Sequence, residues 1–133
     1  MRKIILDTNF LLIPLQFRVD IFSEFCRICH FNYKLFIFEQ SIYELRNIIE
    51  RQSGKSKKAA QFALKLIKLK NISIIKSKQK DDVDSLILNN SSKDAVIATQ
   101  DLNLKRELFN KGYSVIILRQ KKYLKMVERI LSI

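Results

Sequence analysis

Short apolar runs alternate along the chain with longer segments whose apolar residues recur at helical spacing. Five runs predict β-strands, at residues 3–6, 33–38, 72–75, 95–99 and 114–118. Six amphipathic segments predict α-helices, at residues 19–29, 41–51, 57–69, 82–90, 102–110 and 121–131, and a helical turn at 9–12 is expected to end at Pro14. Strands that alternate with helices form parallel sheets covered on both faces. The pattern therefore predicts an α/β fold with a five-stranded parallel sheet in a single domain, residues 1–133.

The composition indicates a folded protein that binds a polyanion. A chain of 133 residues with 47% hydrophobic residues, two Gly and one Pro is too apolar, and too poor in Gly and Pro, for a disordered or collagen-like protein. Lys and Arg outnumber Asp and Glu by 25 to 13, which gives a formal net charge of +12. This charge on a small domain favours either nucleic acid or an acidic membrane surface as the partner.

The N-terminal residues do not match an export signal. The apolar run that follows Lys3 is interrupted at 7–9 by Asp-Thr-Asn, and the next apolar stretch, 10–15, is too short to span a bilayer. A cytoplasmic location without a membrane partner is therefore expected.

Both cysteines lie in the motif Cys26-Arg27-Ile28-Cys29-His30, which matches the C-x-x-C-H pattern of covalent haem attachment. Haem attachment requires export, and the apolar residues of this segment recur at helical spacing, so two buried thiols on a helix are the preferred interpretation. His30 is the only histidine in the chain. One histidine leaves too few ligands for a tetrahedral Cys/His zinc site and argues against a Ser-His-Asp triad.

Four acidic residues occupy positions where an α/β sheet gathers functional groups. Asp7 ends the first predicted strand, Asp101 follows the fourth, Glu44 lies in the helix after the second strand, and Asp84 lies in the helix before the fourth. Because the carboxyl ends of parallel strands share one edge, these side chains are expected to converge there. Converging carboxylates repel one another, so a positive ion is expected between them, and hard oxygen ligands favour Mg²⁺ or Mn²⁺.

Each acidic residue also has an ordinary structural alternative. Asp7 and Asp101 suit N-caps of the helical segments that follow them. Asp81 and Asp84, three residues apart, suit the N-cap and first turn of a helix, and Glu44 suits a solvated helix face. Four unrelated local roles explain the expected convergence of these acids at one sheet edge less well than one common site does.

The ordered motifs around these acids resemble the PIN-domain nucleases. The segment IILDTN (4–9) is similar to the family's opening strand and first carboxylate, IYEL (42–45) to the second, DSLI (84–87) to the third, and IATQDLNLK (97–105) to the fourth. The resemblance covers nearly the whole chain. One departure is that rRNA-processing relatives often carry two adjacent acids where this chain has Asp84-Ser85.

Within the family, Lys105-Arg106 and the segment VIILRQKKY (115–123) are most similar to the archaeal rRNA-processing branch. The VapC-type toxin ribonucleases of toxin-antitoxin pairs are the nearest alternative. The partners implied are RNA together with ribosomal precursor particles or an antitoxin protein, with a homodimer as a further alternative.

The resemblance implies a three-layer α/β/α sandwich and a Mg²⁺- or Mn²⁺-dependent endoribonuclease that acts in rRNA or other RNA processing. The implied metal ligands and catalytic residues are Asp7, Glu44, Asp84 and Asp101. The metal would activate water and stabilise charge at the phosphate, which removes the need for a histidine base. The groups implied to orient carboxylates or water by hydrogen bonds are Thr8, Asn9 and Thr99.

Basic residues are concentrated between 51 and 80, where the chain has no acidic residue. Within the predicted helix at 57–69, Lys58, Lys65 and Lys68 lie off the apolar face and are expected to contact RNA phosphates without reading bases. An ordinary solvated helix face is the alternative. A second basic set lies nearer the predicted catalytic edge and is expected to hold the substrate: Lys105, Arg106, Arg119, Lys121 and Lys122.

Three other functions compete with this interpretation. A phosphatase of the haloacid-dehalogenase type also has an Asp after its first strand, but it needs a second acid where this chain has Asn9. A non-catalytic RNA-binding or ribosome-assembly module stays an alternative, although a site without catalysis has no reason to retain four repelling carboxylates. Membrane-surface binding lacks a suitable basic amphipathic helix with aromatic residues.

Overall fold

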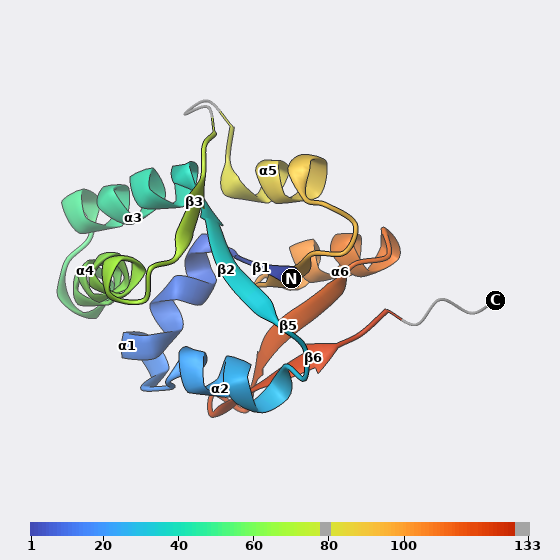
Figure 1. Ribbon diagram of the computed structural model, residues 1–133. Coiled ribbons are helices and arrows are strands. Elements are labelled where there is room, and N and C mark those ends of the chain that lie inside the picture. The colour runs from blue at the N-terminus through green and yellow to red at the C-terminus, as the bar shows by residue number, and fades with distance from the viewer. Residues whose placement is uncertain (78–80, 130–133) are drawn as a thin grey trace.

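The computed structural model describes residues 1–77 and 81–129, which form one six-stranded sheet (Figure 1). The strands are β1 (Arg2–Leu6), β2 (Tyr33–Phe38), β3 (Ser73–Ile75), β4 (Val96–Ala98), β5 (Ser114–Arg119) and β6 (Tyr123–Val127). Their order is β3-β2-β1-β4-β5-β6, and every neighbouring pair is parallel except β5 and β6. The order reverses between β1 and β4, so the carboxyl ends of these two strands lie side by side.

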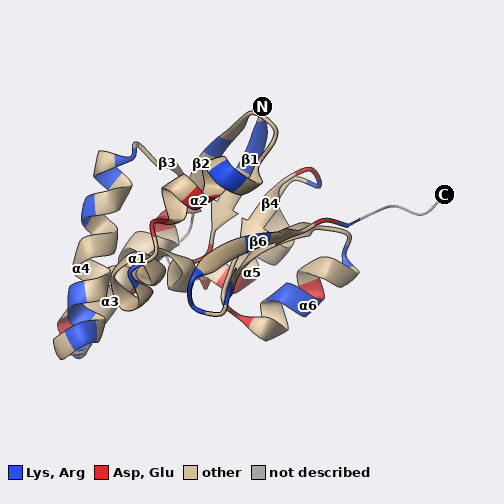
Figure 2. Cartoon of the chain, turned by 90° about the horizontal axis from the view of Figure 1, so that it is seen from below, with Lys and Arg blue, Asp and Glu red and all other residues tan. Residues whose placement is uncertain are grey.

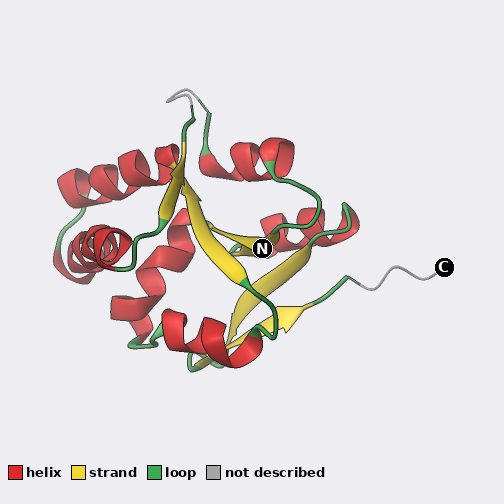
Figure 3. Cartoon of the chain, viewed as in Figure 1, coloured by secondary structure: helices red, strands yellow, loops and turns green. Residues whose placement is uncertain are grey.

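Helices cover both faces of the sheet (Figure 3). One face carries the 3₁₀-helix η1 (Thr8–Leu12) and helices α1 (Ile13–Phe17), α2 (Ile21–Ile28), α3 (Glu39–Arg51) and α4 (Gly54–Leu69). The other face carries α5 (Val83–Asn90) and α6 (Leu102–Asn110). The predicted three-layer α/β/α sandwich is therefore confirmed. Within the described ranges, no helix is long and apolar enough to cross a membrane.

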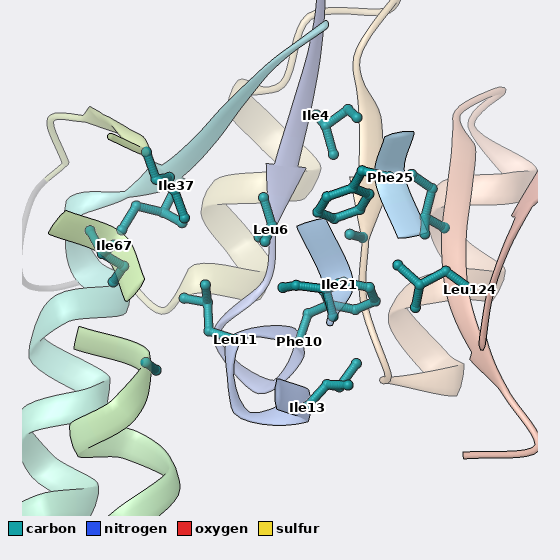
Figure 4. Packing of buried hydrophobic residues seen from close by; sticks show 14 of the residues in the cluster. Ile4, Leu6, Phe10, Leu11, Ile13, Ile21, Phe25, Ile37, Ile67 and Leu124 are labelled. Carbon is teal, nitrogen blue, oxygen red and sulfur yellow. The ribbon is translucent and has the colours of Figure 1, made fainter. Parts of the chain in front are cut away.

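Alternating side chains of the central strands divide the core into two layers. Ile4 and Leu6 of β1 pack toward η1 and α1–α4, whereas Ile5 packs toward α5 and α6. Figure 4 shows the first of these layers, in which the rings of Phe10 and Phe25 stack with their centroids 6.0 Å apart. Strands buried on both faces are continuous apolar runs, which is why the hydrophobic pattern predicted them.

The segment at 121–131 is not the helix that its apolar spacing predicted. Residues 123–127 form β6, which pairs antiparallel with β5, and residues 130–133 lie outside the described part of the chain. Leu124 and Met126, two residues apart, both pack on the α1–α4 side of the core, as alternate residues of a strand do. The hairpin also satisfies backbone groups that the edge of β5 would otherwise expose. The sheet therefore has six strands, and it is not entirely parallel.

Side chains of α2 cover the outer edge of β6. The Leu124 N–H donates to Glu24 Oε1 at 2.9 Å, and Arg27 donates to the Leu124 carbonyl at 2.9 Å. The hydrogen bonds from Arg27 also hold the pKa of Glu24 below its usual range. These contacts occupy backbone groups with which another strand could otherwise pair.

Two local expectations are also corrected. The turn η1 ends at Leu12, but Pro14 does not stop the chain there, because a new helix, α1, begins at Ile13 and holds Pro14 in its first turn, where the missing N–H removes no hydrogen bond. Cys29 is buried as expected, whereas Cys26 is exposed and its Sγ lies 3.3 Å from the Tyr33 hydroxyl.

Candidate active site

Asp7 lies at the carboxyl end of β1, beside the end of β4. Leu6 is paired with Ala98, and the Asp7 N–H donates to the Ala98 carbonyl at 2.9 Å. The Asp7 residue is 3% exposed, and its carboxylate accepts hydrogen bonds from the Thr8 N–H at 2.9 Å and the Thr99 hydroxyl at 2.7 Å. Both carboxylate oxygens are therefore held in place at the sheet edge.

Thr99 connects Asp7 to Asp101. The buried Thr99 hydroxyl donates to Asp7 Oδ2 and accepts from the Asp101 N–H at 3.0 Å. Asp101 is the N-cap of α6, because its Oδ1 accepts from the N–H groups of Asn103 and Leu104 at 2.9 and 3.1 Å. Both capping bonds use Oδ1, so capping does not engage Oδ2, and a second role for this carboxylate is compatible with the cap.

Glu44 reaches the same edge from α3. Its Oε1 accepts from the Thr8 hydroxyl at 2.6 Å, and its Oε2 accepts from the Val83 N–H at 3.3 Å, at the start of α5. The Thr8 hydroxyl also lies 2.9 Å from the Ser41 hydroxyl. Because Thr8 has one hydroxyl proton and a carboxylate only accepts, Ser41 is the donor in that second pair. Two segments distant in sequence thus hold the Glu44 carboxylate.

Asp84 lies in the first turn of α5 but does not cap it. The N-cap is Asp82, whose Oδ1 accepts from the Ser85 N–H at 2.8 Å. Hydrogen bonds from Ser85 hold the pKa of Asp82 below its usual range. The N-cap considered from the sequence, Asp81, is therefore wrong, whereas Asp84 does lie in the first turn of the helix.

All four acids line one open pocket of about 330 Å³, called the carboxylate pocket below. The other residues that line it are Thr8, Asn9, Leu12, Asn47 and Ile48. Burial is the main cause that raises the pKa of Asp7 to about 7, and the charges of Asp84 and Glu44 act in the same direction. Partial burial and the charge of Asp101 raise the pKa of Asp84. Neither Lys nor Arg is among the described residues that line this pocket, so the like charges face one another without a cationic side chain between them.

A family model described as a PIN like domain matches residues 4–121. The chain belongs to the PIN-like domain family. The curated protein Ribonuclease VapC4 of Methanocaldococcus jannaschii is 29% identical over 125 residues, which are 92% of this chain and 95% of that relative.

Two solved structures share the fold of this PIN-like domain. One is the PIN domain endonuclease Utp24, with a TM-score of 0.78, 20% identity, and coverage of 98% of this chain and 94% of that chain. The other is a domain of a functionally unknown protein from Methanocaldococcus jannaschii DSM 2661, with a TM-score of 0.60, 14% identity, and coverage of 99% and 100%. The resemblance noted in the sequence is therefore confirmed at the level of the family and the fold.

The carboxylate pocket of this PIN-like domain fits a hard divalent cation by the chemistry of its donors. Its ionisable groups are carboxylates, which Mg²⁺ and Mn²⁺ prefer, and a bound cation would offset the charges of Asp84 and Glu44 that add to the effect of burial on the pKa of Asp7. Within residues 1–77 and 81–129, no three Asp, Glu, His or Cys side chains are placed closely enough to hold a metal ion together as they stand. An open arrangement suits Mg²⁺, which usually keeps several waters and few protein ligands.

Asn9 holds the loop that carries Asp101. Its Oδ1 accepts from the Gln100 N–H at 3.2 Å, and its carbonyl accepts from Gln100 Nε2 at 2.6 Å. Its hydrogen bonds therefore link η1 to the β4–α6 loop, while Thr8 and Thr99 bond the carboxylates directly.

Ser41 and Asn47 also belong to this environment, and the sequence reasoning missed them. Ser41 is completely buried against Thr8, and Asn47 lines the carboxylate pocket. They stand three residues before and three residues after Glu44, so all three share one face of α3. Polar residues at this spacing from Glu44 are the signal that could have found them.

The basic residues predicted on α4 lie apart from the carboxylate pocket. Lys58, Lys65 and Lys68 are exposed, and Figure 2 shows the blue segments of α4 on the far side of the molecule from α6. None of these three lysines is among the described residues that line the carboxylate pocket. Their predicted role is therefore limited to RNA that extends beyond the pocket.

The second basic set lies around α6 and the β5–β6 hairpin. Lys105, Arg119 and Lys121 line a pocket of about 460 Å³ that shares Asp101 with the carboxylate pocket, called the hairpin pocket below. Arg106 lines a neighbouring depression, and Lys122 is exposed on the hairpin turn.

The raised pKa of Asp7 predicts how the metal-free protein responds to pH. The Asp7 carboxyl has a pKa of 3.8 in the unfolded chain and of about 7 in the folded one, so the fold favours its protonated form. This preference stabilises the fold fully below about pH 4 and is lost as the pH rises through 7. The full loss is about 4 kcal/mol. We expect Tm in chelator to fall between about pH 4 and pH 7, and to fall less in Asp7→Asn, which cannot ionise. Parallel Tm profiles of the two proteins would contradict the shift.

Proposed function

We propose that this PIN-like domain is an endoribonuclease that uses Mg²⁺ or Mn²⁺ to hydrolyse RNA phosphodiester bonds. The observation that carries this proposal is the convergence of four acids from four separate segments on one pocket. The net charge of +12 supports a polyanionic substrate. The identity with a relative named as a ribonuclease favours RNA over DNA.

In the proposed reaction, Asp7, Glu44, Asp84 and Asp101 would hold the metal. When bound, the metal would lower the pKa of an attacking water and stabilise charge at the scissile phosphate. Thr8 and Thr99 orient two of these carboxylates through hydrogen bonds of 2.6 and 2.7 Å. Asn9 fixes the loop before Asp101. The lysines of α4 contact phosphates farther along the RNA.

We propose rRNA or other RNA processing in the cytoplasm as the setting. A second candidate, a toxin ribonuclease of a toxin-antitoxin pair, is favoured by the 29% identity with Ribonuclease VapC4. A short antitoxin-like reading frame beside the gene would support the toxin, and its absence would support RNA processing.

The test is cleavage of a labelled single-stranded RNA by the purified chain. We expect internal cleavage with Mn²⁺ or Mg²⁺ and none with EDTA, because four carboxylates without a metal cannot activate water at a phosphate that they repel. Products are resolved on a denaturing gel, and restoring Mn²⁺ after EDTA should restore them.

Two outcomes would contradict this function. Cleavage that continues in EDTA would mean that the proposed metal site is not responsible. RNA binding without cleavage in any divalent metal would favour the non-catalytic RNA-binding module.

A further inference from the structure

The hairpin pocket lies between the start of α6 and the turn of the β5–β6 hairpin. Three cationic side chains line it, from Lys105, Arg119 and Lys121. Figure 2 shows the blue segments of the hairpin turn close to the red start of α6. Since Asp101 lines both pockets, a ligand in the hairpin pocket would be next to whatever occupies the carboxylate pocket.

Apolar surface accompanies these cations. Leu102 is 66% exposed although it is a large hydrophobic residue, and it lines the hairpin pocket together with Phe17 and Leu118. The Lys121 Nζ lies 5.8 Å from the centroid of the Phe17 ring. Cations beside exposed apolar side chains suit a nucleotide, whose phosphate is charged and whose base has an apolar face.

The turn that carries Arg119 and Lys121 has an unusual backbone for its residues. The Lys122 N–H donates to the Arg119 carbonyl at 3.0 Å, and the two residues between them, Gln120 and Lys121, have φ values of +53° and +56°. Hairpin turns with two positive φ values usually contain Asn or Gly, because other residues adopt this conformation at a cost. Residues held in a backbone conformation of this kind are frequent at functional sites. At this turn, glycine would remove the strain but also the Lys121 cation.

The carboxylate pocket has a different neighbour on its other side. A cavity of about 190 Å³ shares Leu12 and Ile48 with it and has Lys55 as the only cation among the described residues that line it. Binding pockets for small molecules are usually roughly 300–1,000 Å³, so the hairpin pocket is large enough for a nucleotide and this cavity is not. The two pockets that adjoin the carboxylate pocket therefore differ in volume and in the number of cations that line them.

We propose that the hairpin pocket binds one unpaired nucleotide of the RNA, adjacent to the scissile phosphate. Lys105, Arg119 and Lys121 contact its phosphate, and Leu102 with Phe17 contacts its base. The base must be unpaired, because a base within a duplex faces the opposite strand and cannot enter a concave pocket. The position relative to the scissile phosphate rests on the proposed ribonuclease function, whereas nucleotide binding does not require cleavage.

The test measures binding of a single-stranded pentanucleotide RNA, and of a duplex with the same sequence, by fluorescence anisotropy in EDTA. The double variant Lys105→Gln, Arg119→Gln is compared with Lys93→Gln, Lys111→Gln, which removes the same charge from exposed residues that do not line the hairpin pocket. We expect the pocket variant to bind the single strand about tenfold more weakly, with a salt slope reduced by about 0.7 for each phosphate that it no longer neutralises. The control should change Kd by less than about twofold.

Two further variants separate base contact and turn geometry from charge. Leu102→Gln should weaken binding of the single strand without changing the salt slope, and it should leave the duplex unaffected. Lys121→Gly should weaken binding of the single strand without lowering Tm, because glycine adopts positive φ freely.

Two results would overturn the nucleotide subsite and leave a general cationic surface. One is that the two double variants weaken binding of the single strand equally. The other is that Leu102→Gln weakens binding of the single strand and of the duplex equally. The proposed function fails separately. Weak binding by the pocket variants in a protein without metal-dependent cleavage would overturn only the ribonuclease proposal. Unchanged binding by these variants in a protein that cleaves RNA would overturn only the subsite.

Discussion

Asp7→Asn is expected to abolish metal-dependent RNA cleavage while the domain stays folded. We expect a loss of at least about a thousandfold in rate, which corresponds to about 4 kcal/mol of transition-state stabilisation. Asparagine keeps the side-chain oxygen that accepts from the Thr8 N–H and can still hydrogen-bond the Thr99 hydroxyl, but it removes the charge that would hold the metal. The measurements are the initial cleavage rate in Mn²⁺ and the Tm in chelator.

Asp20→Asn is the matched control for this experiment. Asp20 caps α2 by accepting from the N–H groups of Phe22 and Ser23, and it does not line the carboxylate pocket. Asparagine caps helices nearly as well as aspartate, so the control should cleave RNA at the rate of the unmodified chain. If both Asp7→Asn and Asp101→Asn cleave as fast as this control, the proposed site is wrong.

Asp84→Asn is expected to remove most of the stabilisation that Mn²⁺ gives the folded protein. At a concentration one hundred times Kd, Mn²⁺ should stabilise the unmodified chain by about 2.7 kcal/mol, or roughly 10 °C in Tm. In chelator, by contrast, Asp84→Asn should have a slightly higher Tm than the unmodified chain, because neutralising Asp84 relieves repulsion from the other acids. Water screens this repulsion because Asp84 is exposed, so the gain is about 1 kcal/mol or less.

The chain provides a control two residues away. Asp82 caps α5 and does not line the carboxylate pocket, so Asp82→Asn should keep the full Mn²⁺ effect. Melting curves of the three proteins, with and without Mn²⁺, test the assignment. A Mn²⁺ effect of the same size in both variants would exclude Asp84 from the metal site.

The central elements were predictable because local pattern and tertiary environment agree there. Residues 4–6 of the first strand are buried on both faces and are therefore all apolar, and the helix at 102–110 has its N-cap, Asp101, immediately before it. Family membership was recognisable for a related reason. Each motif is a short segment that contains one of the acids and part of a strand or helix, so it can be read from local sequence. The sequence also indicated that Asp7 and Asp101 follow strands.

The C-terminal hairpin was not predictable in this way. In the segment at 121–131, Leu124 and Val127 have helical spacing, while Leu124 and Met126 have strand spacing, so periodicity alone does not choose between them. Pairing with β5 and the contacts of Glu24 and Arg27 with the Leu124 backbone decide for the strand. Those two side chains are about a hundred residues away along the chain, and local propensity does not contain them.

The sequence by itself determined the number and type of the acids, the alternation of strands and helices, and the basic character of the surface. Only the tertiary structure decided which acids line one pocket, that Asp82 caps α5, and that Thr99 bonds Asp7, 92 residues before it, and so connects it to Asp101. It also decided that the turn after β5 brings Arg119 and Lys121 to the pocket that contains Asp101. The physical reason is that hydrogen bonds and repulsions act over a few ångströms, and those short distances between remote segments arise from the order and pairing of the strands.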